Sequence, residues 1–155
     1  MKRILTLSII GFLITTCSHD RDCCINTDIA ISIKYLNKVG ENLFDPENGF
    51  SESDITVYHR IDGNWMEYFA GNLDYPKGIR TVQREDGIYL VVFPSTELVK
   101  NDYSETKIEF PENGSDIIKT EIDKSNSTET VTKVWYNDQL KWEGFQTERI
   151  FEIIK

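Results

Sequence analysis

Hydrophobic and polar residues alternate over most of the chain, which is the pattern of β-strands that bury one face. The alternation is clearest at residues 29–35 and 55–61, and a turn signal of the Asp-Gly type follows the second run at residues 62–64. Residues 88–93 are apolar on both faces and end at Pro94, so they predict a central strand. None of these runs has a helical period.

Turn signals separate the apolar runs at intervals of roughly 8–12 residues, as in antiparallel β-sandwiches. Residues 28–155 are therefore expected to form one all-β domain of eight or nine strands, an antiparallel β-sandwich of the immunoglobulin-like or transthyretin-like kind. The chain of 155 residues is long enough to bury a core of its own.

The N-terminus departs from this pattern. Lys2 and Arg3 precede a solid apolar run at residues 4–14, which is shorter than the about 20 residues needed to span a bilayer. Residues 1–16 therefore predict a cleaved signal peptide.

The end of that run, residues 14–17 (Ile-Thr-Thr-Cys), resembles the lipobox of bacterial lipoproteins. The resemblance implies that the leader is removed before Cys17 and that Cys17 is acylated, which would anchor the protein in a lipid bilayer. Residues 17–27 would then form a lipidated cysteine and a polar tether, which spans about 30 Å when extended.

The mature chain also resembles small Bacteroidota envelope lipoproteins of unassigned function. Residues 29–48, 54–63 and 133–144 carry this resemblance together with the lipobox and the acidic stretch after Cys17. It implies an outer-membrane lipoprotein, exposed at the cell surface or held at the periplasmic face, and it supplies no catalytic residues.

Charge restricts the partners further. The formal net charge is −9, and loss of Lys2 and Arg3 with the leader makes it −11. Nucleic acid is not expected as a partner, because phosphate contacts need clustered Lys and Arg. The expected partner is the lipid bilayer, reached through acylated Cys17, and a glycan or protein partner is left open.

The candidate chemistry of the domain is sparse, and we expect no enzyme, catalytic residue, metal or cofactor. His59 alternates with apolar residues, so it is interpreted as a packing side chain. The acidic segment 41–54 offers the oxygen ligands that calcium prefers, but its spacing fails the EF-hand template, so it is interpreted as a solvated loop. The adjacent Cys23 and Cys24 are compatible with a strained vicinal disulfide, an intermolecular pair or free thiols.

The three tryptophans, Trp65, Trp135 and Trp142, are candidates for ligand-facing aromatic residues. The favoured function is a membrane-anchored, non-enzymatic binding or accessory module. A carbohydrate-binding or adhesion lipoprotein is the first alternative, and a carboxylate-based hydrolase is the second.

Overall fold

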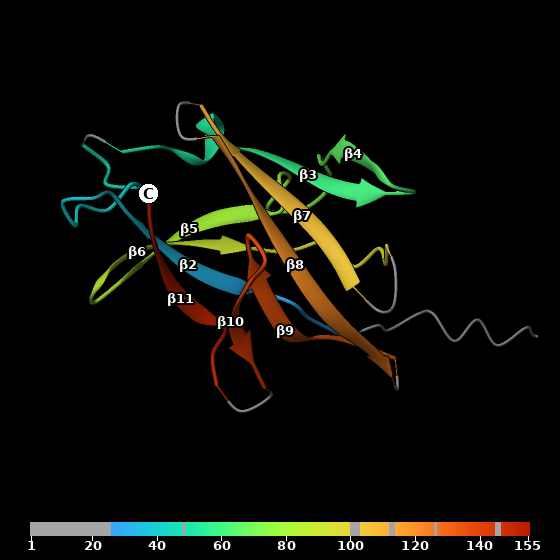
Figure 1. Cartoon of the computed structure of the whole chain (residues 1–155). Helices are drawn as coiled ribbons and strands as arrows, with labels where there is room; N and C mark the ends of the chain where they lie inside the picture. The colour runs from blue at the N-terminus through green and yellow to red at the C-terminus, as the bar shows by residue number, and fades with distance from the viewer. Residues whose placement is uncertain (1–25, 48, 100–102, 112–113, 126, 145–146) are drawn as a thin grey trace, which may run out of the picture.

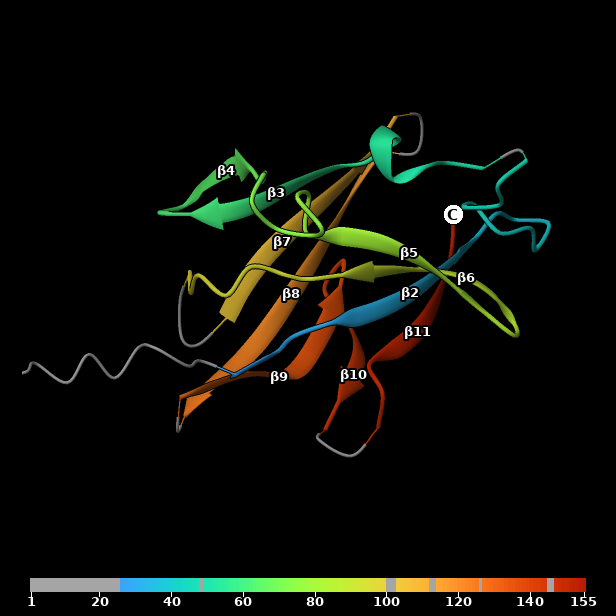
Figure 2. The same cartoon turned by 180° about the vertical axis from the view of Figure 1, so that it is seen from behind.

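Two β-sheets pack face to face in the computed structural model (Figure 1, Figure 2). The structure describes residues 26–47, 49–99, 103–111, 114–125, 127–144 and 147–155. Eleven strands and one short 3-10 turn lie within these ranges. They are β1 (Asn26–Asp28), β2 (Ile31–Leu36), η1 (Glu52–Asp54), β3 (Thr56–Ile61), β4 (Asn64–Glu67), β5 (Ile79–Arg84), β6 (Gly87–Val92), β7 (Tyr103–Phe110), β8 (Gly114–Ser125), β9 (Thr128–Tyr136), β10 (Gln139–Glu143) and β11 (Ile150–Ile154).

The larger sheet has seven strands in the order β1-β9-β8-β7-β3-β4, and β10 also pairs with β9. The smaller sheet has the order β11-β2-β6-β5. Most neighbours are antiparallel, but β1 runs parallel to β9 and β11 runs parallel to β2, so both sheets are mixed. The β3–β4 hairpin has the predicted tight turn, with Asp62 and Gly63 both at positive φ, as a two-residue hairpin turn requires.

The all-β, two-sheet prediction is confirmed, with eleven strands in place of the expected eight or nine. Two parallel pairs, β1 with β9 and β11 with β2, add to the antiparallel pairs that were expected. Strand β1 takes in Asn26 and Thr27, which the sequence placed in the tether. Their polar side chains gave no alternating signal, and the strand is defined by its backbone pairing with β9.

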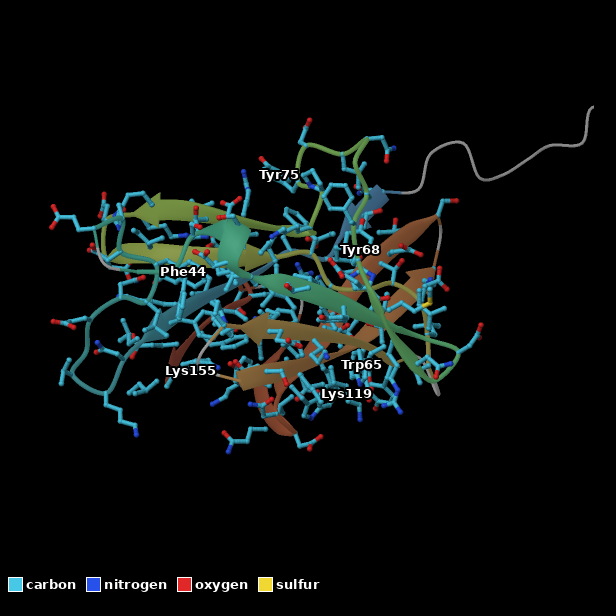
Figure 3. The ribbon with its side chains drawn as sticks, turned by 90° about the horizontal axis from the view of Figure 1, so that it is seen from above. Phe44, Trp65, Tyr68, Tyr75, Lys119 and Lys155 are labelled. Carbon is cyan, nitrogen blue, oxygen red and sulfur yellow. The ribbon has the colours of Figure 1, made fainter. Side chains whose placement is uncertain are left out.

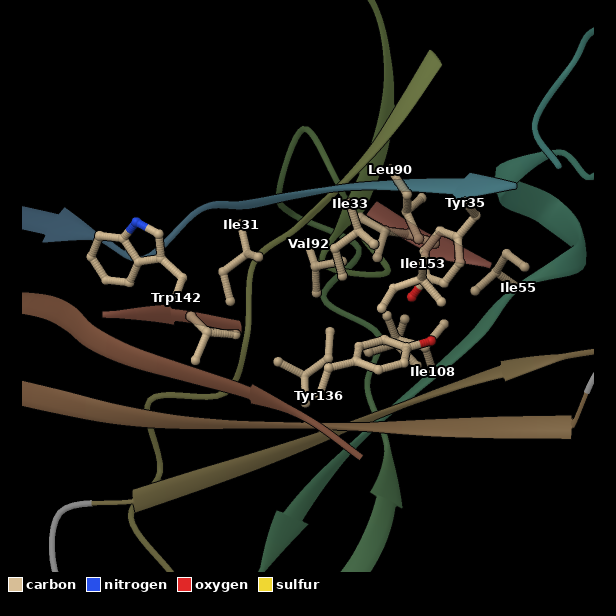
Figure 4. Packing of buried hydrophobic residues seen from close by; sticks show 14 of the residues in the cluster. Ile31, Ile33, Tyr35, Ile55, Leu90, Val92, Ile108, Tyr136, Trp142 and Ile153 are labelled. Atoms are coloured by element: carbon tan, nitrogen blue, oxygen red, sulfur yellow. The ribbon is translucent and has the colours of Figure 1, made fainter. Parts of the chain in front are cut away.

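The core lies between the sheets and is made by the inward positions of the alternating strands (Figure 4). In β7, for example, Thr106 and Ile108 are fully buried, while Lys107 between them faces outward. The buried hydroxyls of Ser104 and Thr120 are hydrogen-bonded to each other, 2.6 Å apart across β7 and β8. The fully buried large side chains are Tyr35, Phe110, Ile31, Ile33, Ile55, Leu90, Ile108, Ile118, Val57, Val92, Val131 and Val134.

Both sheets and this core are built from residues 26–155. A chain that starts at residue 18 therefore keeps every packing contact described here and is expected to fold. The part of the chain that the structure describes contains no helix long and apolar enough to cross a membrane. The predicted signal peptide, Cys17, Cys23 and Cys24 lie outside the described residues.

Candidate functional site

The most distinctive inward-facing residue of the larger sheet is His59 on β3. The residue is only 8 % exposed, and its ring stacks on Tyr68 with ring centroids 4.1 Å apart and planes at 21°. The Nε2 atom of His59 is shielded from solvent and has no hydrogen-bond partner. Buried polar atoms without partners are rare, so His59 is an unusual feature of this sheet.

A cavity of about 620 Å³ opens beside these two rings, and we call it the His59 pocket. It lies at one end of the sandwich, where β3 and the segments after β4 and β6 meet the first strand. Figure 3 shows Tyr68 and Tyr75 at this end, away from Phe44 and Lys155. The lining residues are Thr27, Ile29, His59, Ile61, Tyr68, Leu73, Asp74, Tyr75, Gly78, Phe93, Pro94, Ser95, Thr96, Glu97 and Glu129.

The Tyr68 ring packs closely against the backbone of Gly78 in the pocket wall. This glycine has φ +67, and a Cβ built on it would lie 3.1 Å from Cε1 of Tyr68. A larger residue would therefore be strained in its backbone and would press against the ring. The oxygen of Gly78 accepts a hydrogen bond from the backbone N–H of Phe93, which ties the two wall segments together.

Tyr75 forms the outer wall of the pocket. Its ring stacks on Phe93, with centroids 5.5 Å apart and planes at 7°. The guanidinium of Arg80 lies 4.9 Å from the centre of the Tyr75 ring and donates a 2.8 Å hydrogen bond to its hydroxyl. These contacts hold an otherwise exposed side chain in one position.

The pocket combines an uncharged interior with an acidic rim. Burial lowers the pKa of His59 to about 4, so the imidazole is neutral near pH 7. Three carboxylates, Asp74, Glu97 and Glu129, belong to the lining, and its described residues include no lysine or arginine. Glu129 is paired with Lys124 at 2.8 Å, whereas Asp74 and Glu97 are exposed carboxylates.

The buried imidazole predicts a specific pH dependence of stability. Because the folded-state pKa of His59 lies below the unfolded value of about 6.5, protonation favours the unfolded chain. The contribution of neutral His59 to the free energy of unfolding is therefore fully present above pH 6.5 and decreases as the pH drops towards 4. His59→Phe keeps the stacking on Tyr68 and cannot be protonated. In urea titrations between pH 7 and pH 4, wild type is expected to lose about 2 kcal/mol more than this variant. Parallel losses in the two proteins would contradict a neutral, buried His59.

No protein-family model, curated protein or solved structure matches the chain.

Two of the three predicted ligand-facing tryptophans lie half-buried on the outer face of the larger sheet. Trp65 on β4 has the Arg60 guanidinium 5.6 Å from its ring centre. Trp135 on β9 has the Lys119 ammonium at 5.4 Å, and Trp65 and Lys119 appear on the same side in Figure 3. Neither tryptophan lines the His59 pocket. Cations over the rings leave less free aromatic surface than a flat sugar-binding platform needs.

The prediction that Trp142 faces a ligand is wrong, because this third tryptophan is buried in the core at 8 % exposure. Its indole N–H donates a 2.9 Å hydrogen bond to the hydroxyl of Thr147. A β-bulge causes the difference: Leu140 pairs with outward-facing Trp135, but after the register shift Trp142 pairs with inward-facing Val134.

The carboxylates of the acidic segment 41–54 do not converge on one site. Glu52 accepts hydrogen bonds from the backbone and hydroxyl of Thr81, and Asp54 caps its own turn through Ser51. Asp45 accepts from the backbone of Glu47, and Asn48 lies outside the described residues. Across the described ranges, no three His, Cys, Asp or Glu side chains are placed to hold a metal ion.

A second buried polar cluster lies in the core, and sequence reasoning did not find it. The Nζ of Lys155 lies 2.6 Å from Oδ2 of Asp116, with both side chains about nine-tenths buried. The hydroxyls of Tyr35 and Tyr136 point into the same part of the core (Figure 4). Burial raises the pKa of both tyrosines, so they stay protonated. The cluster is interpreted as a structural ion pair.

Proposed function

We propose that this chain is a membrane-anchored lipoprotein whose β-sandwich is a non-enzymatic binding module, with the His59 pocket as its ligand site. The N-terminal pattern of two cations, a short apolar run and Cys17 supports the anchor. The pocket supports the binding role, and the anchor would place it in the outer membrane, at the cell surface or on the periplasmic face.

The observation that carries the binding proposal is the pocket itself. Its volume of about 620 Å³ falls within the range of about 300–1,000 Å³ that is typical of ligand sites in proteins. Its walls include Tyr68, Leu73 and Phe93, which offer apolar contact surface. The stacked rings of His59 and Tyr68 add aromatic contact surface to the same wall.

The pocket also lies close to the proposed anchor. Thr27 and Ile29 belong to its lining, and β1 begins nine residues after Cys17. Nine extended residues span about 30 Å, so the pocket would be held near the membrane surface. A ligand that is concentrated at this surface would therefore be presented directly to the module.

An apolar fluorescent probe tests the pocket. N-phenyl-1-naphthylamine is uncharged and gains fluorescence in apolar surroundings, so its titration into the chain from residue 18 measures occupancy. Leu73→Ala removes apolar wall surface from a half-exposed position, and we expect it to weaken the affinity about fivefold, since each buried methylene contributes about 0.8 kcal/mol.

Leu140→Ala is the matched control, because Leu140 is also 50 % exposed but lies on β10 and does not line the pocket. It should leave the affinity unchanged. Equal weakening by both variants, or no saturable fluorescence with wild type, would refute the His59 pocket as the ligand site.

A further inference from the structure

Exposed apolar side chains gather around the His59 pocket and extend its apolar surface outward. We call them the apolar collar: Met66, Phe69, Leu73, Tyr75 and Leu98. They are 53, 68, 50, 36 and 41 % exposed, respectively, and they are five of the nine large apolar residues exposed in the described part of the chain. Such a concentration is unlike the scattered apolar residues of an ordinary surface and is typical of an interaction site.

The position of each collar residue follows from its neighbours. Leu73 and Tyr75 line the pocket, and Phe69 shares an adjoining hollow with Tyr75. Met66 pairs with His59 across β3 and β4, so both side chains lie on the same face of the sheet. Leu98 directly follows the pocket residue Glu97. The collar therefore covers more surface than a ligand confined to the pocket would bury.

The described lining of the His59 pocket carries carboxylates and no lysine or arginine, while Arg80 and Lys124 lie beside it, on Tyr75 and Glu129 respectively. Asp74, Glu97 and Glu129 stand among the lining residues, and the chain carries a net charge of −9. The neutral imidazole of His59 adds no opposing positive charge near pH 7. A cationic partner is therefore attracted to the rim, whereas an anionic lipid surface is repelled by it.

We propose that the apolar collar and the His59 pocket bind a basic peptide segment of a partner protein. This inference rests on the function proposed above and names the class of ligand. One aromatic or large aliphatic side chain of the peptide enters the pocket, and neighbouring lysine or arginine side chains lie against the exposed carboxylates of Asp74 and Glu97. The arrangement is that of a protein interface with a buried anchor residue inside a polar rim.

Three short peptides test this directly on the chain from residue 18. The probes are acetyl-Lys-Trp-Lys-amide, acetyl-Glu-Trp-Glu-amide and acetyl-Lys-Ala-Lys-amide, and each is titrated while displacement of N-phenyl-1-naphthylamine is followed. The Lys-Trp-Lys peptide is expected to bind about tenfold more tightly than Glu-Trp-Glu at low salt, and more tightly than Lys-Ala-Lys. Added salt should reduce the preference for the basic peptide, because the carboxylates of Asp74 and Glu97 are exposed.

A pair of double variants isolates the rim. Asp74→Asn with Glu97→Gln removes two exposed carboxylates and should abolish the tenfold preference while the neutral probe still binds. Asp45→Asn with Glu47→Gln makes the same charge change in the loop near Phe44, at the other end of the molecule (Figure 3), and should keep the preference.

Several results would overturn the inference. Equal affinity for the Lys-Trp-Lys and Glu-Trp-Glu peptides would contradict the charge preference. Equal affinity for Lys-Trp-Lys and Lys-Ala-Lys would contradict the anchor side chain in the pocket. An equal loss of preference in both double variants would contradict the role of the rim. Co-sedimentation with neutral phosphatidylcholine vesicles that the peptides do not reverse would instead assign the collar to lipid. Failure of the neutral probe to bind wild type would refute the proposed function itself, whereas probe binding without charge preference would refute only the inference about the ligand.

Discussion

Replacement of Lys155 by methionine is expected to lower the free energy of unfolding by about 3 kcal/mol, because it leaves the Asp116 carboxylate buried without its cation. The side-chain amide of Asn137 still donates to Oδ1 of this carboxylate at 3.0 Å. One amide donor does not replace an ammonium group 2.6 Å away in a largely buried site. Urea denaturation at pH 7, followed by tryptophan fluorescence, measures the change.

Two further variants separate the ion pair from a general effect of losing a lysine. Lys124→Met removes a lysine whose side chain is 38 % exposed and paired with Glu129, so it should cost less than about 1 kcal/mol. Combining Lys155→Met with Asp116→Asn removes the uncompensated charge and should recover part of the lost stability. A loss below 0.5 kcal/mol in Lys155→Met, on the order of the effect of a surface substitution, would contradict the buried pair.

Much of the fold was predictable because local patterns decide it. The alternation in β3 and its Asp-Gly turn produced the β3–β4 hairpin as expected, and the apolar run before Pro94 became the buried strand β6. The parallel partners were not predictable, because which strand lies beside β1 or β11 depends on long-range pairing. The polar residues of β1 carry no signal of a strand at all.

The candidate site was harder to predict from the sequence, because it also depends on how distant segments pair. Trp142 shows the limit: regular alternation places it on the same face as Leu140, and only the β-bulge between them turns it into the core. His59 was recognised as an inward-facing residue, but its missing hydrogen-bond partner is visible only in three dimensions. Apolar residues such as Phe69 and Leu73, outside any alternating run, were the one sequence signal that could have pointed to the pocket.

Replacement of Cys17 by serine is expected to abolish lipid attachment. The apolar run before this residue is too short to span a bilayer, so we infer that stable anchoring comes from acyl chains on Cys17. Serine lacks the thiol that carries the thioether-linked diacylglyceryl group of bacterial lipoproteins. Metabolic labelling with an alkynyl fatty acid should therefore mark wild type strongly and the variant at background level, and the intact mass of the variant should include the unprocessed leader.

The chain offers its own matched controls, because Cys23 and Cys24 are the two other cysteines. Cys23→Ser and Cys24→Ser should both keep full labelling, since neither follows the apolar run at the distance where the lipobox-like segment places Cys17. Labelling that persists in Cys17→Ser but disappears in either control would move the anchor to that cysteine. Because Cys23 and Cys24 lie within three residues of Asn26, such a result would bring the His59 pocket almost into contact with the membrane. Labelling absent from wild type would remove the anchor and leave the pocket as the module of a protein without a lipid.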